Sequence, residues 1–75
     1  MFSKEIFAER LGFLRKNAGI TQSALAAAIG INRTAITLME SGERAASIEV
    51  LCALADYFNV SIDYLVGRSD DPARR

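Results

Sequence analysis

The sequence predicts a compact all-α domain, and three observations lead to this prediction. Apolar residues recur at the three- and four-residue spacing of an amphipathic helix in five separate segments. Each segment starts with a serine, threonine or asparagine that suits a helix N-cap, and most are followed by glycine or asparagine. No alternating run of β-branched and aromatic residues is long enough to indicate a strand. With 75 residues, of which 51% are hydrophobic, the chain suits one packed domain.

The first three helices are predicted over residues 3–18, 21–30 and 32–42. The first is expected to stop at Gly19. Gly30 separates the second from the third because it can take the positive φ of a sharp turn. The apolar positions at helical spacing in these three segments are Ile6, Phe7, Leu11, Leu14, Leu25, Ile29, Ile36 and Met39.

The last two helices are predicted over residues 47–59 and 61–66. The apolar positions of the longer one are Ile48, Leu51, Leu54, Ala55 and Phe58. Cys52 lies in the same apolar run and is expected to be a small buried hydrophobe. The folded domain is therefore assigned to residues 1–67. Residues 68–75, with mixed charges and little to bury, are expected to form a flexible charged tail.

The composition argues against several classes of protein. The chain has no histidine and a single cysteine, so neither an internal disulfide nor a cysteine–histidine metal site is possible. It also lacks a glycine-rich phosphate loop and a nucleophile–base pair. We therefore expect no enzymatic activity and no cofactor. No apolar stretch approaches a membrane span or a signal-peptide core, which favours a cytoplasmic location and no membrane partner.

The charges are balanced overall but unevenly distributed. Lysine and arginine together number nine, as do aspartate and glutamate. Residues 1–20 hold four basic and two acidic side chains, whereas residues 47–66 hold three acidic side chains and no basic one. This asymmetry is a weak electrostatic indication of nucleic-acid binding.

The most informative segment spans residues 22–41, QSALAAAIGINRTAITLMES. It predicts two short helices joined by a tight turn, with the small Ala26 at the point where the helices cross. Ile36 and Met39 would point into the core. The outer face of the second helix then carries Arg33, Thr34, Thr37 and Leu38, and Asn32 stands at its start.

Over residues 4–67 the chain resembles the lambda-repressor-like, XRE-type helix-turn-helix family. The matching pieces are LRKNAGITQSALAAAIGIN, ITLMESGER and LADYFNVSIDYLVG, in the order and at the spacing of the family. The resemblance implies a five-helix fold in which the second motif helix is the recognition helix and lies in the DNA major groove. This docking geometry is a property of the family that the resemblance carries over.

The resemblance also implies roles for particular residues. The positions that would read bases are Asn32, Arg33, Thr34, Thr37 and Leu38. Arg33 has the most specific chemistry because its planar fork can bond both acceptors of a guanine edge. The positions that would contact phosphates are Gln22, Ser41 and Arg44. Arg15 and Glu40 match a pair that forms a structural salt bridge between helices in some relatives.

The segment after the recognition helix departs from the family pattern. It reads Gly42-Glu43-Arg44-Ala45-Ala46, where relatives often carry lysines and a proline. Few phosphate contacts are then available, about three to five per subunit, so one subunit should bind DNA weakly. We therefore expect a homodimer on a pseudo-palindromic operator. The expected interface residues are Val60, Ile62, Tyr64 and Leu65; Tyr57 and Tyr64 are equally compatible with the edge of the core.

Two functions from different classes fit the sequence. The first is a sequence-specific transcriptional regulator, a repressor of the bacterial or phage type, whose partner is double-stranded DNA. The second is an antitoxin-like or adaptor module that uses the same fold to bind a protein, with DNA binding secondary. The zero net charge and Glu43 keep the second open.

Overall fold

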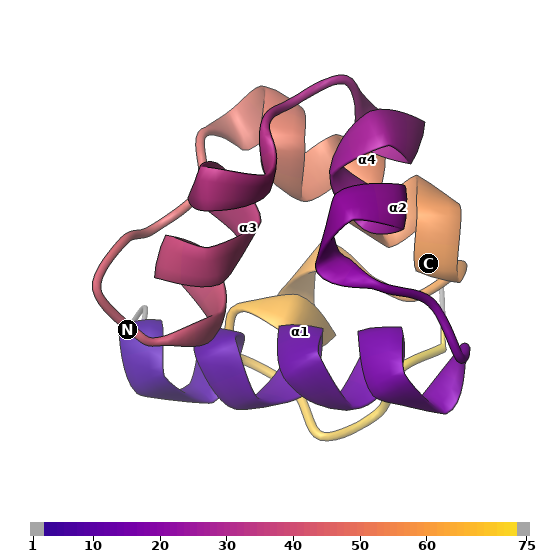
Figure 1. Cartoon of the computed structure of the whole chain (residues 1–75). Coiled ribbons are helices and arrows are strands. Elements are labelled where there is room, and N and C mark those ends of the chain that lie inside the picture. The colour runs from indigo at the N-terminus through magenta and orange to yellow at the C-terminus, as the bar shows by residue number, and fades with distance from the viewer. Residues whose placement is uncertain (1–2, 74–75) are drawn as a thin grey trace.

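The computed structural model describes residues 3–73, and this part of the chain folds into five helices (Figure 1). Their bounds are α1 Lys4–Asn17, α2 Gln22–Ile29, α3 Arg33–Glu40, α4 Ile48–Phe58 and α5 Ile62–Leu65. The predicted all-α, five-helix architecture is confirmed, and each predicted helix is present.

Every helix begins at the N-cap that the sequence predicts. In each case a side-chain oxygen accepts a hydrogen bond from the backbone N–H three residues later, which satisfies one of the donors left open at a helix start. The five capping residues are Ser3, Thr21, Asn32, Ser47 and Ser61. Since each cap stabilises its helix by about 1 kcal/mol, local chemistry explains where these short helices start.

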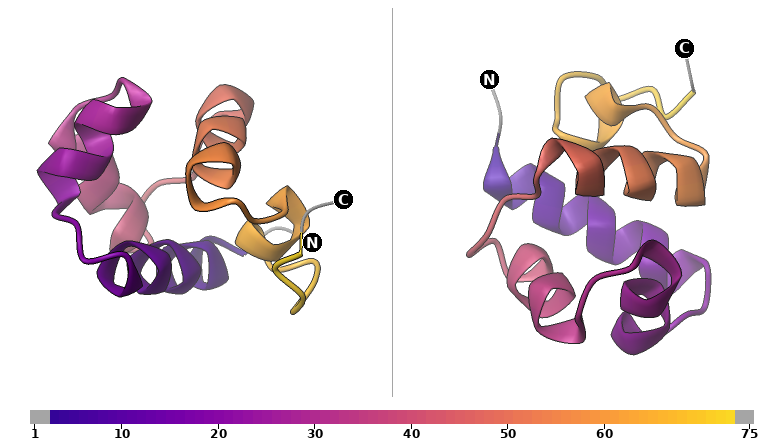
Figure 2. Two further views of the ribbon diagram at one scale, coloured as in Figure 1. Left: turned by 90° about the vertical axis from the view of Figure 1, so that its right-hand side faces the viewer. Right: turned by 90° about the horizontal axis from the view of Figure 1, so that it is seen from above.

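All five helices contribute to one hydrophobic core. Burial of their apolar faces, rather than helix propensity alone, holds such short helices in place. The largest fully buried side chains are Phe7, Leu11, Leu25, Ile36, Leu54 and Leu65. In the left view of Figure 2, α2 and α3 lie on one side of the molecule and α4 and α5 on the other, and α1 runs along the base.

The turn between α2 and α3 depends on Gly30. Its φ is 78°, in the left-handed region, and the next amide, that of Ile31, donates to the carbonyl of Ala26 at 3.0 Å. A Cβ at Gly30 would meet no atom within 4 Å. The backbone dihedral, and not lack of space, therefore favours glycine here. Ala26 is buried in the core, as predicted for a small residue between crossing helices.

Two expectations about α4 were wrong. Cys52 is exposed, and Ile48, expected on the inner face, is 71% exposed. Ile48 shares a helical stripe with the buried Leu51 and Ala55, but it is the first residue of α4, and its side chain is left outside the core. Because α4 is apolar on nearly all sides, its sequence does not indicate which apolar positions the other helices cover.

The segment after α5 is connected to the domain by hydrogen bonds. Arg10 on α1 donates to the carbonyl groups of Tyr64 and Ser69, the latter at 2.6 Å, and pairs with Asp70 at 2.8 Å. The amide of Ser61 donates to the carbonyl of Pro72 at 3.0 Å. The flexibility predicted for residues 68–75 stays a prediction, and residues 74–75 lie outside the described part. Within residues 3–73, no helix combines the length and hydropathy needed to cross a membrane.

Candidate nucleic-acid interface

The outer face of α3 is the first part of the site. Arg33, Thr34 and Thr37 are exposed, while Ile36 and Met39 are buried beneath them. The helix therefore has the orientation that the sequence predicts: its apolar stripe is fixed in the core and its polar stripe faces solvent. A surface of this kind is accessible to a second molecule.

Arg33 stands at the first turn of α3 with its charge available. Among residues 3–73 no hydrogen-bond acceptor or carboxylate pairs with its guanidinium. A free guanidinium can donate two parallel hydrogen bonds to a guanine edge or to a phosphate.

The other candidate base-reading residues differ in which side-chain groups remain accessible for contact with DNA. Asn32 caps α3, because its Oδ1 accepts from the amide of Ala35 at 2.8 Å; its NH₂ group remains available. Leu38 is half-buried, so only part of its side chain can meet another molecule. Thr37 is exposed, but its hydroxyl already has partners within the chain.

Arg15 and Glu40 form the predicted salt bridge, which joins α1 to α3. The guanidinium donates from Nε to Glu40 Oε2 at 2.6 Å and from Nη2 to Oε1 at 3.0 Å, and Nη1 donates to the carbonyl of Ile20 at 2.9 Å. The side chains are only 13% and 10% exposed. The hydrogen bond with Glu40, together with its charge, raises the pKa of Arg15 against the opposing effect of burial.

Gln22, the first residue of α2, extends this salt bridge to the outer face of α3. Its Nε2 donates to Glu40 Oε1 at 3.2 Å, and its Oε1 accepts from Thr37 Oγ1 at 2.9 Å. The structure thus brings together a predicted phosphate contact, a predicted base-reading residue and the predicted salt bridge. No sequence pattern indicates the Gln22–Thr37 contact, because the two residues belong to different helices.

The segment after α3 contains the remaining predicted phosphate contacts. Ser41 and Arg44 are both exposed, and Ser41 Oγ lies 2.7 Å from Glu43 Oε2, to which it donates. Arg44 and Asn32 line the same hollow, of about 340 Å³, between the start of α3 and the start of α4. The guanidinium of Arg44 and the amide of Asn32 therefore lie at one edge of the α2–α3 surface. The carboxylate of Glu43 adjoins Arg44 in the sequence.

The predicted dimer residues do not share one environment. Val60 and Leu65 are buried in the core of the chain itself, so for these two the prediction is corrected. Both side chains belong to the buried core cluster and are not accessible to a second subunit. Ile62 is exposed and Tyr64 is half-buried, and these two remain accessible on α5.

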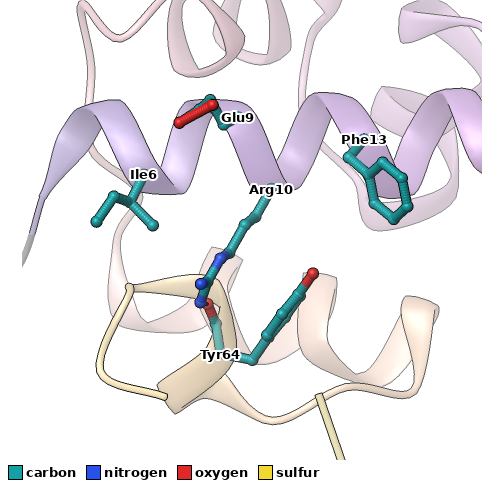
Figure 3. A pocket seen from close by; sticks show the side chains of 5 residues that line it. All are labelled: Ile6, Glu9, Arg10, Phe13 and Tyr64. Carbon is teal, nitrogen blue, oxygen red and sulfur yellow. The ribbon is translucent and has the colours of Figure 1, made fainter. Parts of the chain in front are cut away.

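A second hollow, of about 410 Å³, lies between α1 and α5 (Figure 3). Arg10 extends across it, with its guanidinium 4.3 Å from the centre of the Tyr64 ring, a cation–π contact. Phe13, 60% exposed, lies at its other end. None of its lining residues comes from α2 or α3. No pattern in the sequence indicates a functional role for Arg10 or Phe13.

Metal binding has no support in the described part of the chain. Across residues 3–73 no group of three or more cysteine, aspartate or glutamate side chains is close enough to hold an ion. The chemistry that the α2–α3 surface offers is therefore hydrogen bonding and charge.

Comparison with known proteins points to one class. A family model described as helix-turn-helix matches residues 7–65. The transcriptional repressor RstR of the cryptic phage CTXphi in Vibrio cholerae is 43% identical over 60 residues, which are 80% of this chain and 54% of RstR. The uncharacterized regulator YobD of Bacillus subtilis is 34% identical over 67 residues, 89% of this chain and 60% of YobD. The chain thus spans little more than half of these two relatives.

Solved structures agree with the sequence relatives. The P22 c2 repressor, solved in complex with a synthetic operator, matches with a TM-score of 0.81 and 33% identity, over 85% of this chain and 97% of that one. The restriction-modification controller protein C.AhdI of Aeromonas hydrophila matches with a TM-score of 0.75 and 29% identity, over 83% of this chain and 90% of that one.

The fold and the α2–α3 surface define a helix-turn-helix protein. The chain belongs to the helix-turn-helix family of the XRE, lambda-repressor-like type, a family of transcriptional regulators and not of enzymes.

Proposed function

We propose that the chain is a sequence-specific DNA-binding transcriptional regulator, acting as a repressor in the cytoplasm. In this proposal α3 enters the major groove, and occupancy of an operator excludes RNA polymerase. The observation that carries the proposal is the exposed polar face of α3, fixed from beneath by the buried Ile36 and Met39.

Three further observations support the proposal. The guanidinium of Arg33 has no partner within residues 3–73, so no internal bond must break before it binds a base. Gln22 lies at the start of α2, where a helix N-terminus favours a phosphate. The similar P22 c2 repressor was solved with an operator, and RstR is named a repressor.

We further propose a homodimer on a pseudo-palindromic operator, with half-sites about one helical turn apart. A single subunit offers few cations, so a second linked subunit is needed for useful affinity at physiological salt. Ile62 and Tyr64 on α5 are the accessible residues that we assign to the interface. Ile62→Asp should weaken both self-association in sedimentation and DNA binding, while the circular dichroism spectrum stays helical.

The adaptor function remains the second candidate because Glu43 places a carboxylate beside the proposed phosphate contacts. A salt titration separates the two functions. Binding to genomic DNA fragments should weaken by about 10³–10⁵ between 50 and 200 mM salt for a dimer with six to ten phosphate contacts. No binding even at the lower salt would contradict the regulator and favour the adaptor.

Arg44→Ala and Arg68→Ala provide a matched pair of variants for this titration. Both remove one exposed arginine, but Arg68 lies after α5, paired with Asp63, and far along the chain from α2 and α3. Arg44→Ala removes one phosphate contact from each subunit of the dimer and should reduce the salt slope by about 1.8, and Arg68→Ala should leave it unchanged. Equal slopes for the two variants would contradict the assignment of Arg44.

A further inference from the structure

A chain of hydrogen bonds with a fixed direction leads from α1 to the outer face of α3. It starts at Arg15, whose guanidinium can only donate. Both oxygens of Glu40 accept from it, at 2.6 and 3.0 Å. An ionised carboxylate only accepts hydrogen bonds. Any further neighbour of Glu40 must therefore present a donor.

Gln22 is that neighbour, and its amide can take only one orientation. Its Nε2 lies 3.2 Å from Glu40 Oε1. The reverse orientation would place the amide oxygen against the carboxylate, with no proton between two acceptors. With the NH₂ group directed at Glu40, the amide oxygen is directed at Thr37 Oγ1, 2.9 Å away.

The hydroxyl proton of Thr37 is then directed at an acceptor within the protein. Within residues 3–73 the two hydrogen-bonding neighbours of the hydroxyl are Gln22 Oε1 at 2.9 Å and the carbonyl oxygen of Arg33 at 3.1 Å. Both are acceptors, and a hydroxyl has a single proton. Whichever neighbour receives it, the proton stays inside the protein, and the outer side of the Thr37 oxygen offers lone pairs only.

From this geometry we infer that Thr37 is a specificity-determining residue that reads DNA as a hydrogen-bond acceptor. It selects the exocyclic amino group of adenine or cytosine on the strand that it faces. It rejects the keto oxygen of guanine or thymine, because two acceptors would then meet without a proton between them. This inference rests on the proposed function and adds the chemistry of one contact.

Gln22 becomes a positioning residue in this arrangement and can still contact a phosphate. Its NH₂ group has two hydrogens, and within residues 3–73 only Glu40 uses one of them. The second hydrogen is free for a phosphate oxygen. The same amide can therefore hold the backbone of the duplex and fix the direction of the Thr37 hydroxyl.

The test begins with selection from a random duplex pool by the full chain and by Thr37→Val, which keeps the shape of the side chain but removes the hydroxyl. The position whose base preference changes in Thr37→Val is the position that Thr37 reads. Thr37→Ser, which keeps the hydroxyl, should retain the preference. A motif that is the same for wild type and Thr37→Val would overturn the inference.

Selection alone does not decide the direction of the hydrogen bond, because every base pair has an amino group on one strand and a keto group on the other. Duplexes that lack one of these groups do decide it. In an A·T pair, purine replaces adenine to remove the amino group, or 5-methyl-2-pyrimidinone replaces thymine to remove the keto group. In a G·C pair, 2-pyrimidinone and 2-aminopurine serve in the same way.

We expect removal of the amino group to weaken wild-type binding about fivefold to tenfold and to leave Thr37→Val unaffected. Removal of the keto group should change wild type and Thr37→Val by the same factor. Two results would overturn the inference and leave the proposed function as a regulator intact. In the first, only removal of the keto group affects wild type more than Thr37→Val. In the second, neither removal affects the two proteins differently. If wild type enriches no sequence, the proposed function fails and the inference fails with it.

Discussion

At the scale of single residues, Glu43 is the feature that least suits a DNA surface. It lies three residues after the end of α3, is exposed, and accepts a hydrogen bond from Ser41 at 2.7 Å. A carboxylate beside a phosphate backbone is repelled, and it also occupies the hydroxyl of Ser41, itself a predicted phosphate contact. In the proposed complex Glu43 therefore limits affinity.

Glu43→Gln should raise DNA affinity about two- to fivefold at low salt, the size of an exposed charge interaction of up to about 1 kcal/mol. The amide keeps an acceptor for Ser41 and removes only the charge. Fluorescence anisotropy with a labelled operator measures the change. Glu9→Gln is the matched control, since Glu9 is exposed and lines the hollow between α1 and α5. An equal gain in both variants would show that only the total charge matters.

At the scale of the helices, the Arg15–Glu40 pair fixes how α3 sits on α1. The two side chains are 13% and 10% exposed, so each depends on the other to offset the loss of water. The ion pair of Arg10 with Asp70 has similar length, at 2.8 Å, but the carboxylate of Asp70 is fully exposed. Solvent screens such a pair, and little stability is expected from it.

These two ion pairs make a direct comparison of stability. Glu40→Gln should reduce the free energy of unfolding by on the order of 2–4 kcal/mol, because Arg15 keeps its charge in a largely buried site. Asp70→Asn should leave it almost unchanged, because solvent screens the fully exposed carboxylate. Urea denaturation followed by circular dichroism measures both. Similar small losses would mean that the buried pair does not anchor α3.

Two glycines with positive φ should differ in how far they tolerate alanine. At Gly30, φ 78°, an added Cβ meets nothing within 4 Å, so only the strain of about 1–2 kcal/mol for a left-handed residue is expected. At Gly67, φ 85°, the Cβ would lie 3.0 Å from the side chain of Ile6. Gly67→Ala should therefore lower the melting temperature more than Gly30→Ala; the reverse order would contradict this account.

The sequence predicts helices better than contacts between them. The five N-caps were all predicted, because a cap depends on residues within one turn of each other. Cys52 is misplaced because α4 is apolar on most of its circumference, and Ile48 is misplaced because periodicity does not show that the first residue of α4 is left outside the core. The Arg15–Glu40 pair was found only through the family resemblance. The link from Gln22 to Thr37, between helices, had no signal in the chain.

At the scale of the whole molecule, zero net charge conceals a separation of charge. The acidic residues Glu49, Asp56 and Asp63 are exposed on α4 and α5, on the side of the molecule opposite α2 and α3 (Figure 2). This distribution disfavours approach of a phosphate backbone to α4 and α5 and leaves the α2–α3 side as the favoured one. The domain measures only 27 × 23 × 21 Å, so a single copy can contact a short stretch of duplex.

The central claim is that the exposed face of α3 reads DNA sequence, and selection from a random duplex pool by wild type and by Arg33→Ala tests it most directly. Wild type should enrich a motif with two related half-sites. Arg33→Ala should lose the preference at one base pair in each half-site, equivalent to about 1–3 kcal/mol of discrimination, and keep the rest of the motif. Failure of wild type to enrich any motif, or an identical motif for both proteins, would contradict the claim.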